Sequence, residues 1–178
     1  MKIEDDFLDQ EEFDNIQSLM MKDQITWCYS PGIVRAPLYN SIENEDNDFQ
    51  FTHTFYFNSA PQSPFFYQLN PILEILNPMS LWRTKANLLT RTPDIIENLL
   101  HTDIGDLENS PEQLKQWTTS IFYVNTNDGY TKFEDGSIVE SVANRMVTFP
   151  SNIKHTGTSC TNKNTRVVIN FNYFKRES

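Results

Sequence analysis

His101 and Asp103, two residues of the kind that bind metals, lie two positions apart in the stretch NLLHTDIGD. A His-x-Asp pair is weak evidence alone, because a loop can contain both residues by chance. If the stretch is an extended strand, residues i and i+2 face the same side, so the imidazole and the carboxylate can reach one point in a barrel interior. Two ligands do not hold a metal firmly, so the pair needs a third residue from elsewhere in the chain.

His155, in FPSNIKHTGTSC, is the candidate for that third ligand. It follows a Pro-containing turn and precedes the final strand-like stretch, and a jelly-roll topology can return it to the first pair. Two imidazoles and one carboxylate on one face leave the other octahedral positions free, which is the facial triad typical of non-haem Fe(II) oxygenases. His53, in FTHTFYF, has no acidic residue at a useful spacing, and we expect a packed or edge-strand histidine there.

Arg166 begins the strongly apolar stretch RVVINFNYF, and its side chain can face either the barrel interior or solvent. If it points inward it needs an anionic partner, because an unpaired buried guanidinium is costly and its planar fork suits a carboxylate. Taken singly, Arg166 could equally be a surface cation. We treat it as a candidate site residue because it follows the three candidate ligands in the sequence.

Length, charge and composition narrow the class of protein. The 178 residues are 38% hydrophobic and 13% aromatic, which fits one globular domain. A net charge of -10 argues against a nucleic-acid partner, which would require clustered Lys and Arg. The start MKIEDDFLDQ lacks a signal pattern, and no apolar stretch is long enough to span a bilayer, so we expect a cytoplasmic protein without membrane contact. Cys28 and Cys160 lack C-x-x-C spacing and are expected to be idle or buried thiols.

Two helices are expected in the first part of the chain. In LDQEEFDNIQSLMMK, Asp9 is placed for an N-cap with Glu12 three residues on, and apolar residues follow at helical spacing: Phe13, Ile16, Leu19 and Met20. A second helix, interrupted near Pro71, is expected between Ser63 and Pro78. These helices would brace one face of the strands that follow.

After Pro78 the sequence is typical of a run of short strands. The segments are rich in Val, Ile, Thr, Phe and Tyr and are separated by turn sequences such as NDG and EDG: LWRTKANLL, SIFYVN, TKF, SIVESV, RMVTF and TRVVINFNYF. We therefore expect a mainly β, α+β fold with N-terminal helices and a jelly-roll, cupin-like double-stranded β-helix core. One domain would cover residues 1–178, with helical support and a lid region over 1–80 and the core over 81–178.

The order of these motifs resembles the Fe(II)/2-oxoglutarate-dependent dioxygenases of the prolyl 4-hydroxylase type. His-x-Asp is followed by FYVN, GYTKFEDG, NRMVTFPSNIKHTG and an arginine in the last strand, and DDFLDQEEFDNI resembles the family's opening helix. The resemblance covers nearly the whole chain and is weakest from Tyr39 to Met79. In its compact length and its acidic, Asn-rich composition, the chain is similar to small members of the family from marine bacteria and their phages. For a phage-encoded protein, the expected location is the host cytoplasm.

The resemblance implies a role for individual residues. His101, Asp103 and His155 match the iron ligands, and Arg166 matches the residue that pairs with the distal carboxylate of 2-oxoglutarate. Three further matches are less specific, since each can be an ordinary strand residue: Tyr123, expected to reach the same carboxylate; Thr131, in the Gly-Gly-x-Thr-x-Phe segment that reads DGYTKF here; and Asn87, which could face cosubstrate or substrate. Asp128 stands where the first glycine of that segment usually lies, which puts the local turn in doubt.

The implied activity is hydroxylation of an unactivated C–H bond with release of succinate and CO₂. The implied cofactors are Fe(II), 2-oxoglutarate and O₂, with ascorbate as a further candidate. A peptidyl proline is the expected substrate, although a small molecule stays open. A lid from Tyr39 to Pro64 is expected to close over it. The sequence does not indicate an oligomeric state, or which of four other cations line the pocket: Arg83, Lys85, Arg91 and Arg145.

Two alternatives remain open at this stage. A cupin-like module could hold a metal or a small acid with the same three ligands and oxidise nothing. Arg166 discriminates, because such a module has no reason to keep a dicarboxylate clamp at that place. A noncatalytic relative that kept the barrel for protein contacts is the other alternative, and the intact set of candidate ligands argues against it.

Overall fold

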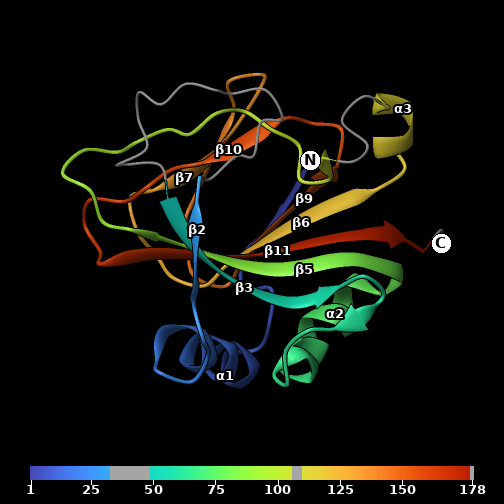
Figure 1. Ribbon diagram of the computed structural model, residues 1–178, viewed down its shortest axis with the longest axis horizontal. Coiled ribbons are helices and arrows are strands. Elements are labelled where there is room, and N and C mark those ends of the chain that lie inside the picture. The colour runs from blue at the N-terminus through green and yellow to red at the C-terminus, as the bar shows by residue number, and fades with distance from the viewer. Residues whose placement is uncertain (33–48, 106–109, 177–178) are drawn as a thin grey trace.

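The computed structural model describes residues 1–32, 49–105 and 110–176, which form two antiparallel sheets with helices on the outer face of the larger one (Figure 1). The major sheet contains, in spatial order, β1 (Lys2–Glu4), β9 (Arg145–Pro150), β6 (Thr118–Tyr123), β11 (Thr165–Lys175), β5 (Pro78–Thr90), β3 (Phe49–Phe57) and β2 (Cys28–Pro31), and β4 (Ala60–Pro61) pairs with β3. The minor sheet contains β10 (His155–Gly157), β7 (Tyr130–Phe133) and β8 (Ile138–Glu140). This arrangement confirms the expected jelly-roll core.

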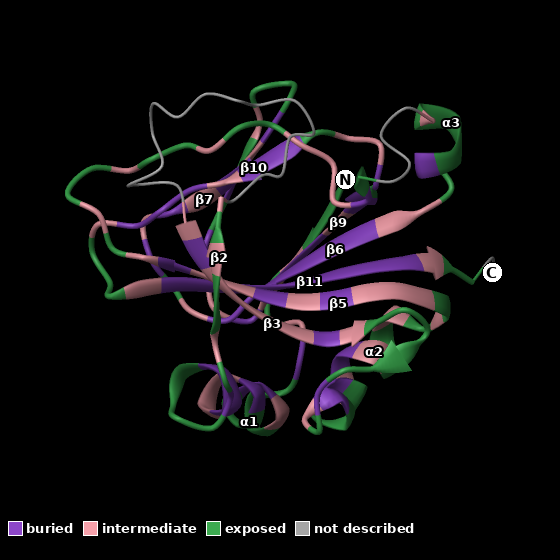
Figure 2. Ribbon diagram, in the orientation of Figure 1, coloured by how far each residue is buried: buried purple, intermediate pink, exposed green. Residues whose placement is uncertain are grey.

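Strand β11 lies at the centre of the major sheet and is buried on both faces (Figure 2). Successive side chains of a strand point to opposite faces. The odd-numbered residues pack toward the helices: Val167, Ile169, Phe171 and Tyr173. On the other face, Val168 packs in the space between the two sheets, and Arg166 and Asn170 line a cavity there. The same strand therefore supplies core residues to one side and polar residues to the other.

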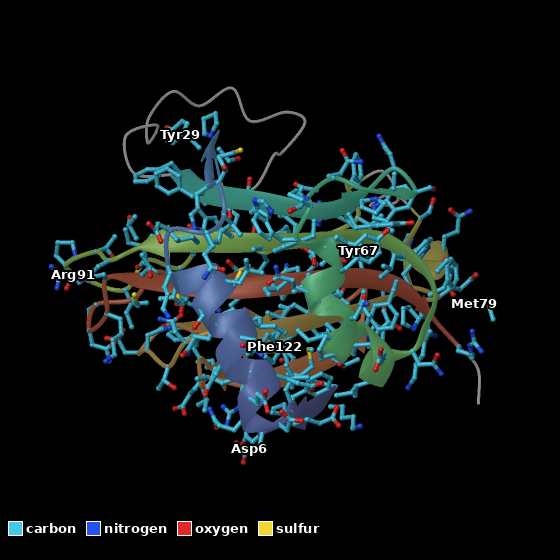
Figure 3. All side chains as sticks on the ribbon, turned by 90° about the horizontal axis from the view of Figure 1, so that it is seen from below. Asp6, Tyr29, Tyr67, Met79, Arg91 and Phe122 are labelled. Carbon is cyan, nitrogen blue, oxygen red and sulfur yellow. The ribbon has the colours of Figure 1, made fainter. Side chains whose placement is uncertain are left out.

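Helices α1 and α2 cover the outer face of the major sheet, and Phe122 lies between them (Figure 3). In α1 (Gln10–Met21), the Asp9 side chain accepts a hydrogen bond of 3.0 Å from the Glu12 amide, and the four expected apolar residues are buried. The second helix begins as the 3₁₀ turn η2 (Phe66–Leu69) and continues as α2 (Asn70–Leu76), and α3 (Pro111–Leu114) is one short turn. None of the helices in the described ranges is long and apolar enough to cross a membrane.

The expectation of a lid from Tyr39 to Pro64 is wrong for most of the described residues in that range. Residues 49–57 form β3, which pairs with β2 on one side and β5 on the other. The reason is the alternation of FQFTHTFYF, whose aromatic and β-branched residues fit a pleated, half-buried surface. Residues 39–48, including the acidic stretch 41–48, lie outside the described residues.

Asn144 fastens the N-terminal segment to the sheet. Its side-chain oxygen accepts from the Leu8 amide at 3.0 Å, and its side-chain nitrogen donates to the Leu8 carbonyl at 2.8 Å. Its own backbone is left-handed, with φ of 61°. Residues 5–9 therefore enter α1 from a fixed position.

Replacing Asn144 by Ala should lower the free energy of unfolding by about 2 kcal/mol, because two buried hydrogen bonds are lost. Asn144→Gly loses the same bonds but relieves the left-handed backbone, so it should cost less. Urea unfolding of the three proteins measures both changes. An unaltered free energy in Asn144→Ala would show that the clamp does not contribute.

Candidate metal centre

Three side chains of the expected set converge on one point. One nitrogen of His101, one oxygen of Asp103 and one nitrogen of His155 all lie within 4.8 Å of one another. The expected strand through His101 and Asp103 is not observed: His101 makes an isolated antiparallel bridge to His155, and Asp103 lies in a bend. The bridge consists of two backbone hydrogen bonds of 3.0 Å, one in each direction. Pairing with the minor sheet, rather than alternation along a strand, brings the ligands together.

Hydrogen bonds orient both imidazole rings. His101 Nδ1 lies 3.0 Å from the Leu99 carbonyl oxygen, and His155 Nδ1 lies 3.4 Å from that of Ile153. A carbonyl only accepts, so each Nδ1 carries the proton and each Nε2 has a free lone pair. Both Nε2 atoms lie 4.0 Å from Asp103 Oδ1, too far for a hydrogen bond. Burial lowers the pKa of His155, which favours the neutral ring that a metal requires.

Asp103 is a buried carboxylate that stays ionised. Burial by itself would raise its pKa, but the positive potential of His155, Arg83 and His101 and a hydrogen bond from Asn172 together hold the pKa below its ordinary value. The Arg83 guanidinium also donates to the Asp103 carbonyl at 2.9 Å. The three candidate ligands thus offer two imidazole nitrogens and one anionic oxygen.

A solvent-connected cavity extends from these ligands between the two sheets. Its walls combine apolar and polar side chains, among them Leu89, Ile121, Val168, Asn87, Lys85 and Thr131. Arg166 also lines the cavity, and it lies on the same face of β11 as Asn170, which contacts Asp103. The candidate ligands and a buried cation therefore share one space.

Arg166 points inward and is only 3% exposed. Its Nε donates to Ser141 Oγ at 2.8 Å, and its Nη2 donates to Thr131 Oγ1 at 3.1 Å. Burial lowers the pKa of the guanidinium, and no acidic partner for it is found in the described parts of the chain. Because an unpaired buried guanidinium is costly, this arrangement suits an anionic ligand in the cavity.

Tyr123 and Thr131 contact each other beside this arginine. Tyr123 Oη donates to Thr131 Oγ1 at 2.8 Å, and the Arg166 guanidinium lies 5.7 Å from the Tyr123 ring centre. Thr131 lines the cavity, whereas Tyr123 lies behind it. Since the Thr131 oxygen accepts from both neighbours, its own hydroxyl proton is available to a ligand.

Two glycines leave room for the arginine. A Cβ on Gly157 would lie 3.1 Å from Arg166 Nη1, and a Cβ on Gly129 would lie 2.7 Å from Arg166 Cδ and 2.6 Å from the Ser159 carbonyl oxygen. In the segment DGYTKF, Gly129 therefore occupies a position where a side chain has no room. Asp128, at the other position, accepts from the Thr161 amide at 2.8 Å and so fixes the turn with its side chain.

The remaining candidates are now placed. Asn87 lines the cavity, and its side-chain oxygen is buried without a partner among the described residues. Arg145 pairs with Asp5 at 2.6 Å outside the cavity, and Arg91 is exposed at the far end of β5 from Met79 (Figure 3).

His53 lies outside the candidate metal centre. Its ring nitrogens lie 2.8 Å from the Thr26 carbonyl oxygen and 2.9 Å from Ser63 Oγ, as fits a packed histidine. Both cysteines are free thiols: Cys28 is exposed and Cys160 is buried.

Four residues of the site were missed or left undecided by sequence reasoning: Arg83, Ser141, Asn170 and Asn172. The two asparagines carried a usable signal, because they follow Arg166 at even spacing along β11 and so share its face. Ser141 and Arg83 carried none, since their partners come from segments far away in the sequence.

The residues present fit a divalent metal together with an anionic ligand. Two imidazole nitrogens and one carboxylate suit iron and similar metals. The Arg166 guanidinium has two hydroxyl acceptors but no acidic partner among the described residues, and the Asn87 side-chain oxygen has no partner there, so both can interact with a ligand.

No protein-family model matches the sequence, and the search of curated proteins finds no match. Solved structures do share the fold. A prolyl hydroxylase from Trichoplax adhaerens, solved in complex with a peptide fragment of hypoxia inducible factor, is 11% identical, with a TM-score of 0.63 over 98% of this chain and 83% of that one. A Pseudomonas putida prolyl-4-hydroxylase is 14% identical, with a TM-score of 0.55 over 99% and 92%. Streptomyces hygroscopicus HygX, solved with nickel, 2-oxoglutarate and hygromycin B, is 13% identical, with a TM-score of 0.58 over 97% and 82%.

Proposed function

We propose that this chain, which has the fold of prolyl hydroxylases and other 2-oxoglutarate–Fe(II) oxygenases, is itself an Fe(II)- and 2-oxoglutarate-dependent dioxygenase, with residues 1–178 as one domain. The reaction would hydroxylate an unactivated C–H bond and release succinate and CO₂. One observation carries the proposal: a single cavity contains a His-Asp-His cluster and a buried arginine with no acidic partner in the described residues.

In this proposal each group of the cavity has one task. His101, Asp103 and His155 hold the iron, and Arg166 pairs with the distal carboxylate of 2-oxoglutarate, helped by the hydroxyl of Thr131. Iron and 2-oxoglutarate supply, with O₂, the oxidising chemistry that amino-acid side chains lack. The protein orients the ligands through the two Nδ1 hydrogen bonds, and the cavity between the two sheets would hold substrate and cosubstrate beside them.

A non-oxidising cupin-like module is the alternative, and Arg166 argues against it. A site that held only a metal would gain nothing from a buried guanidinium, whose desolvation is costly. The 3.1 Å approach that a Gly157 Cβ would make to Arg166 indicates a space shaped around this side chain.

The first test is anaerobic binding. With Fe(II) and 2-oxoglutarate together, the wild-type protein should develop a weak visible charge-transfer band and become more resistant to heat. His101→Ala and Asp103→Ala should each abolish the band, because the remaining two ligands do not hold the metal. A wild-type protein with neither band nor 2-oxoglutarate-dependent stabilisation would refute the oxygenase assignment.

Arg166→Ala should weaken 2-oxoglutarate binding strongly and leave metal affinity nearly unchanged. Truncating one partner of a buried charge pair costs about 2–5 kcal/mol, or roughly 30-fold and more in affinity. Arg166→Lys should recover only part of the loss, since an ammonium cannot form the same two parallel bonds. Titration of 2-oxoglutarate into the metal-loaded proteins measures these affinities, and equal affinity in wild type and Arg166→Ala would mean that the cosubstrate is held elsewhere.

For the primary substrate we propose a proline in a peptide or protein. The support is the order of motifs and the shared fold with prolyl hydroxylases, one of which was solved with a peptide fragment. Loops on a rigid scaffold are where recognition of an extended chain is usually built. A free amino acid would instead require paired groups for its ammonium and its carboxylate.

The substrate test offers the iron- and 2-oxoglutarate-loaded protein a proline-rich peptide library and free L-proline in parallel. Succinate release coupled to a gain of one oxygen atom in a peptide is the expected result. Coupled oxidation of free proline, with every peptide unchanged, would overturn the choice of substrate and leave the dioxygenase assignment standing.

A further inference from the structure

The two oxygens of the Asp103 carboxylate have different surroundings. Oδ1 lies 4.0 Å from the Nε2 atoms of both His101 and His155. Oδ2 accepts from Asn172 Nδ2 at 3.0 Å and from Asn170 Nδ2 at 3.2 Å, and the Asn170 nitrogen also lies 3.4 Å from Oδ1. Oδ1 therefore faces the imidazoles, whereas Oδ2 accepts the two shorter amide hydrogen bonds, one of them from Asn172 alone.

The orientation of these amides is fixed by chemistry. An ionised carboxylate only accepts, so the NH₂ group of each asparagine must point at Asp103. Asn172 uses its nitrogen again, donating to Thr119 Oγ1 at 3.2 Å on the neighbouring strand β6. Both amides thus act as donors to the candidate ligand.

Apart from their hydrogen bonds to Asp103, the two asparagines do little for the stability of the fold. Asn170 is 7% exposed and Asn172 is 0% exposed, and the side-chain oxygen of each is buried without a partner in the described chain. Leaving a buried polar atom unpaired is unfavourable, and an apolar residue of similar size would avoid that cost. Their neighbours in β11 are apolar: Val168, Ile169, Phe171 and Tyr173. The donors toward Asp103 are what distinguishes these two positions.

We propose that Asn170 and Asn172 are positioning residues that keep Asp103 Oδ2 engaged, so that Asp103 binds the metal through Oδ1 alone. The inference rests on the proposed function. A carboxylate that bound through both oxygens would take one of the three positions left open by a facial triad. Two positions for 2-oxoglutarate and one for O₂ require all three. The asparagines therefore preserve the third open position.

The test uses Co(II), which reports on its own coordination through its visible spectrum. Asn172→Leu should weaken Co(II) binding by about 10–100-fold, the usual range for residues that orient metal ligands. It should also change the shape and intensity of the Co(II) absorption, because Oδ2 loses its shortest hydrogen-bond donor and can approach the metal. The metal-free variant should unfold at a somewhat lower temperature than wild type, since Asp103 and Thr119 each lose a buried donor. The change in the spectrum is therefore the deciding measurement, because a loss of stability alone would not produce it.

Asn87→Leu is the matched control. It is the same substitution on the wall of the same cavity, and the Asn87 oxygen is likewise buried without a partner in the described residues, but Asn87 makes no hydrogen bond to Asp103. Its Co(II) affinity and spectrum should equal those of wild type in the absence of 2-oxoglutarate. If Asn172→Leu fails to fold, Asn170→Leu provides the same measurement through the 3.2 Å donor.

The outcomes separate this inference from the proposed function. Wild-type affinity and spectrum in the asparagine variants would overturn the positioning role while the metal site stands. A weakened affinity with an unchanged spectrum would also overturn it, because the coordination mode would then not depend on the amides. Absence of Co(II) binding by the wild-type protein would instead refute the proposed function.

Discussion

Two backbone hydrogen bonds of 3.0 Å between His101 and His155 join a segment without regular structure to the minor sheet. The same segment is attached again upstream, where the Ile96 amide donates to Ser159 Oγ at 2.9 Å and the Asn98 side chain donates to the Gly157 carbonyl at 2.8 Å. Residues between β5 and Asp103 therefore follow the edge of the minor sheet, and every distance in the candidate metal centre depends on that attachment. The segment has no regular structure of its own, and its position is fixed by its contacts with the sheet.

Charge burial is the second constraint, and the structure meets it differently for Asp103 and for Arg166. Asp103 is surrounded by Arg83, two imidazoles and two amide donors, which together outweigh the loss of hydration. Arg166 has two neutral hydroxyl acceptors and, among the described residues, no carboxylate. Asp103 thus needs no further partner, whereas Arg166 lacks an anionic one among the described residues. The electrostatics therefore favour a ligand with negative charge at the end that lies against Arg166.

Local signals predicted the parts of the fold that local physics determines. The Asp9 cap and the apolar spacing after it placed α1 correctly, because capping and periodicity act within a few residues. The convergence of His101, Asp103 and His155 was predicted from a strand through His101 and from a jelly-roll topology that returns His155 to it. The three residues do meet, but the strand through His101 was wrong. An edge strand at His53 was one expectation for the segment that forms β3, and a lid was the other. The sequence did not decide between them, because an alternating segment forms a strand only when partners such as β2 and β5 are available, and those contacts are distant in sequence.

The polar residues that make the site exceptional are the ones that serve the fold least. Within the described residues, a buried guanidinium without an acidic partner and amide oxygens without donors each oppose folding of the ligand-free chain. A ligand that bound only the folded state would offset this cost, because such binding adds to the stability of that state. Strand β11 shows how one sequence accommodates both demands. Its odd-numbered residues bury apolar surface under the helices and hold the sheet, so that its even-numbered face is free to carry Arg166, Asn170 and Asn172 toward the ligands.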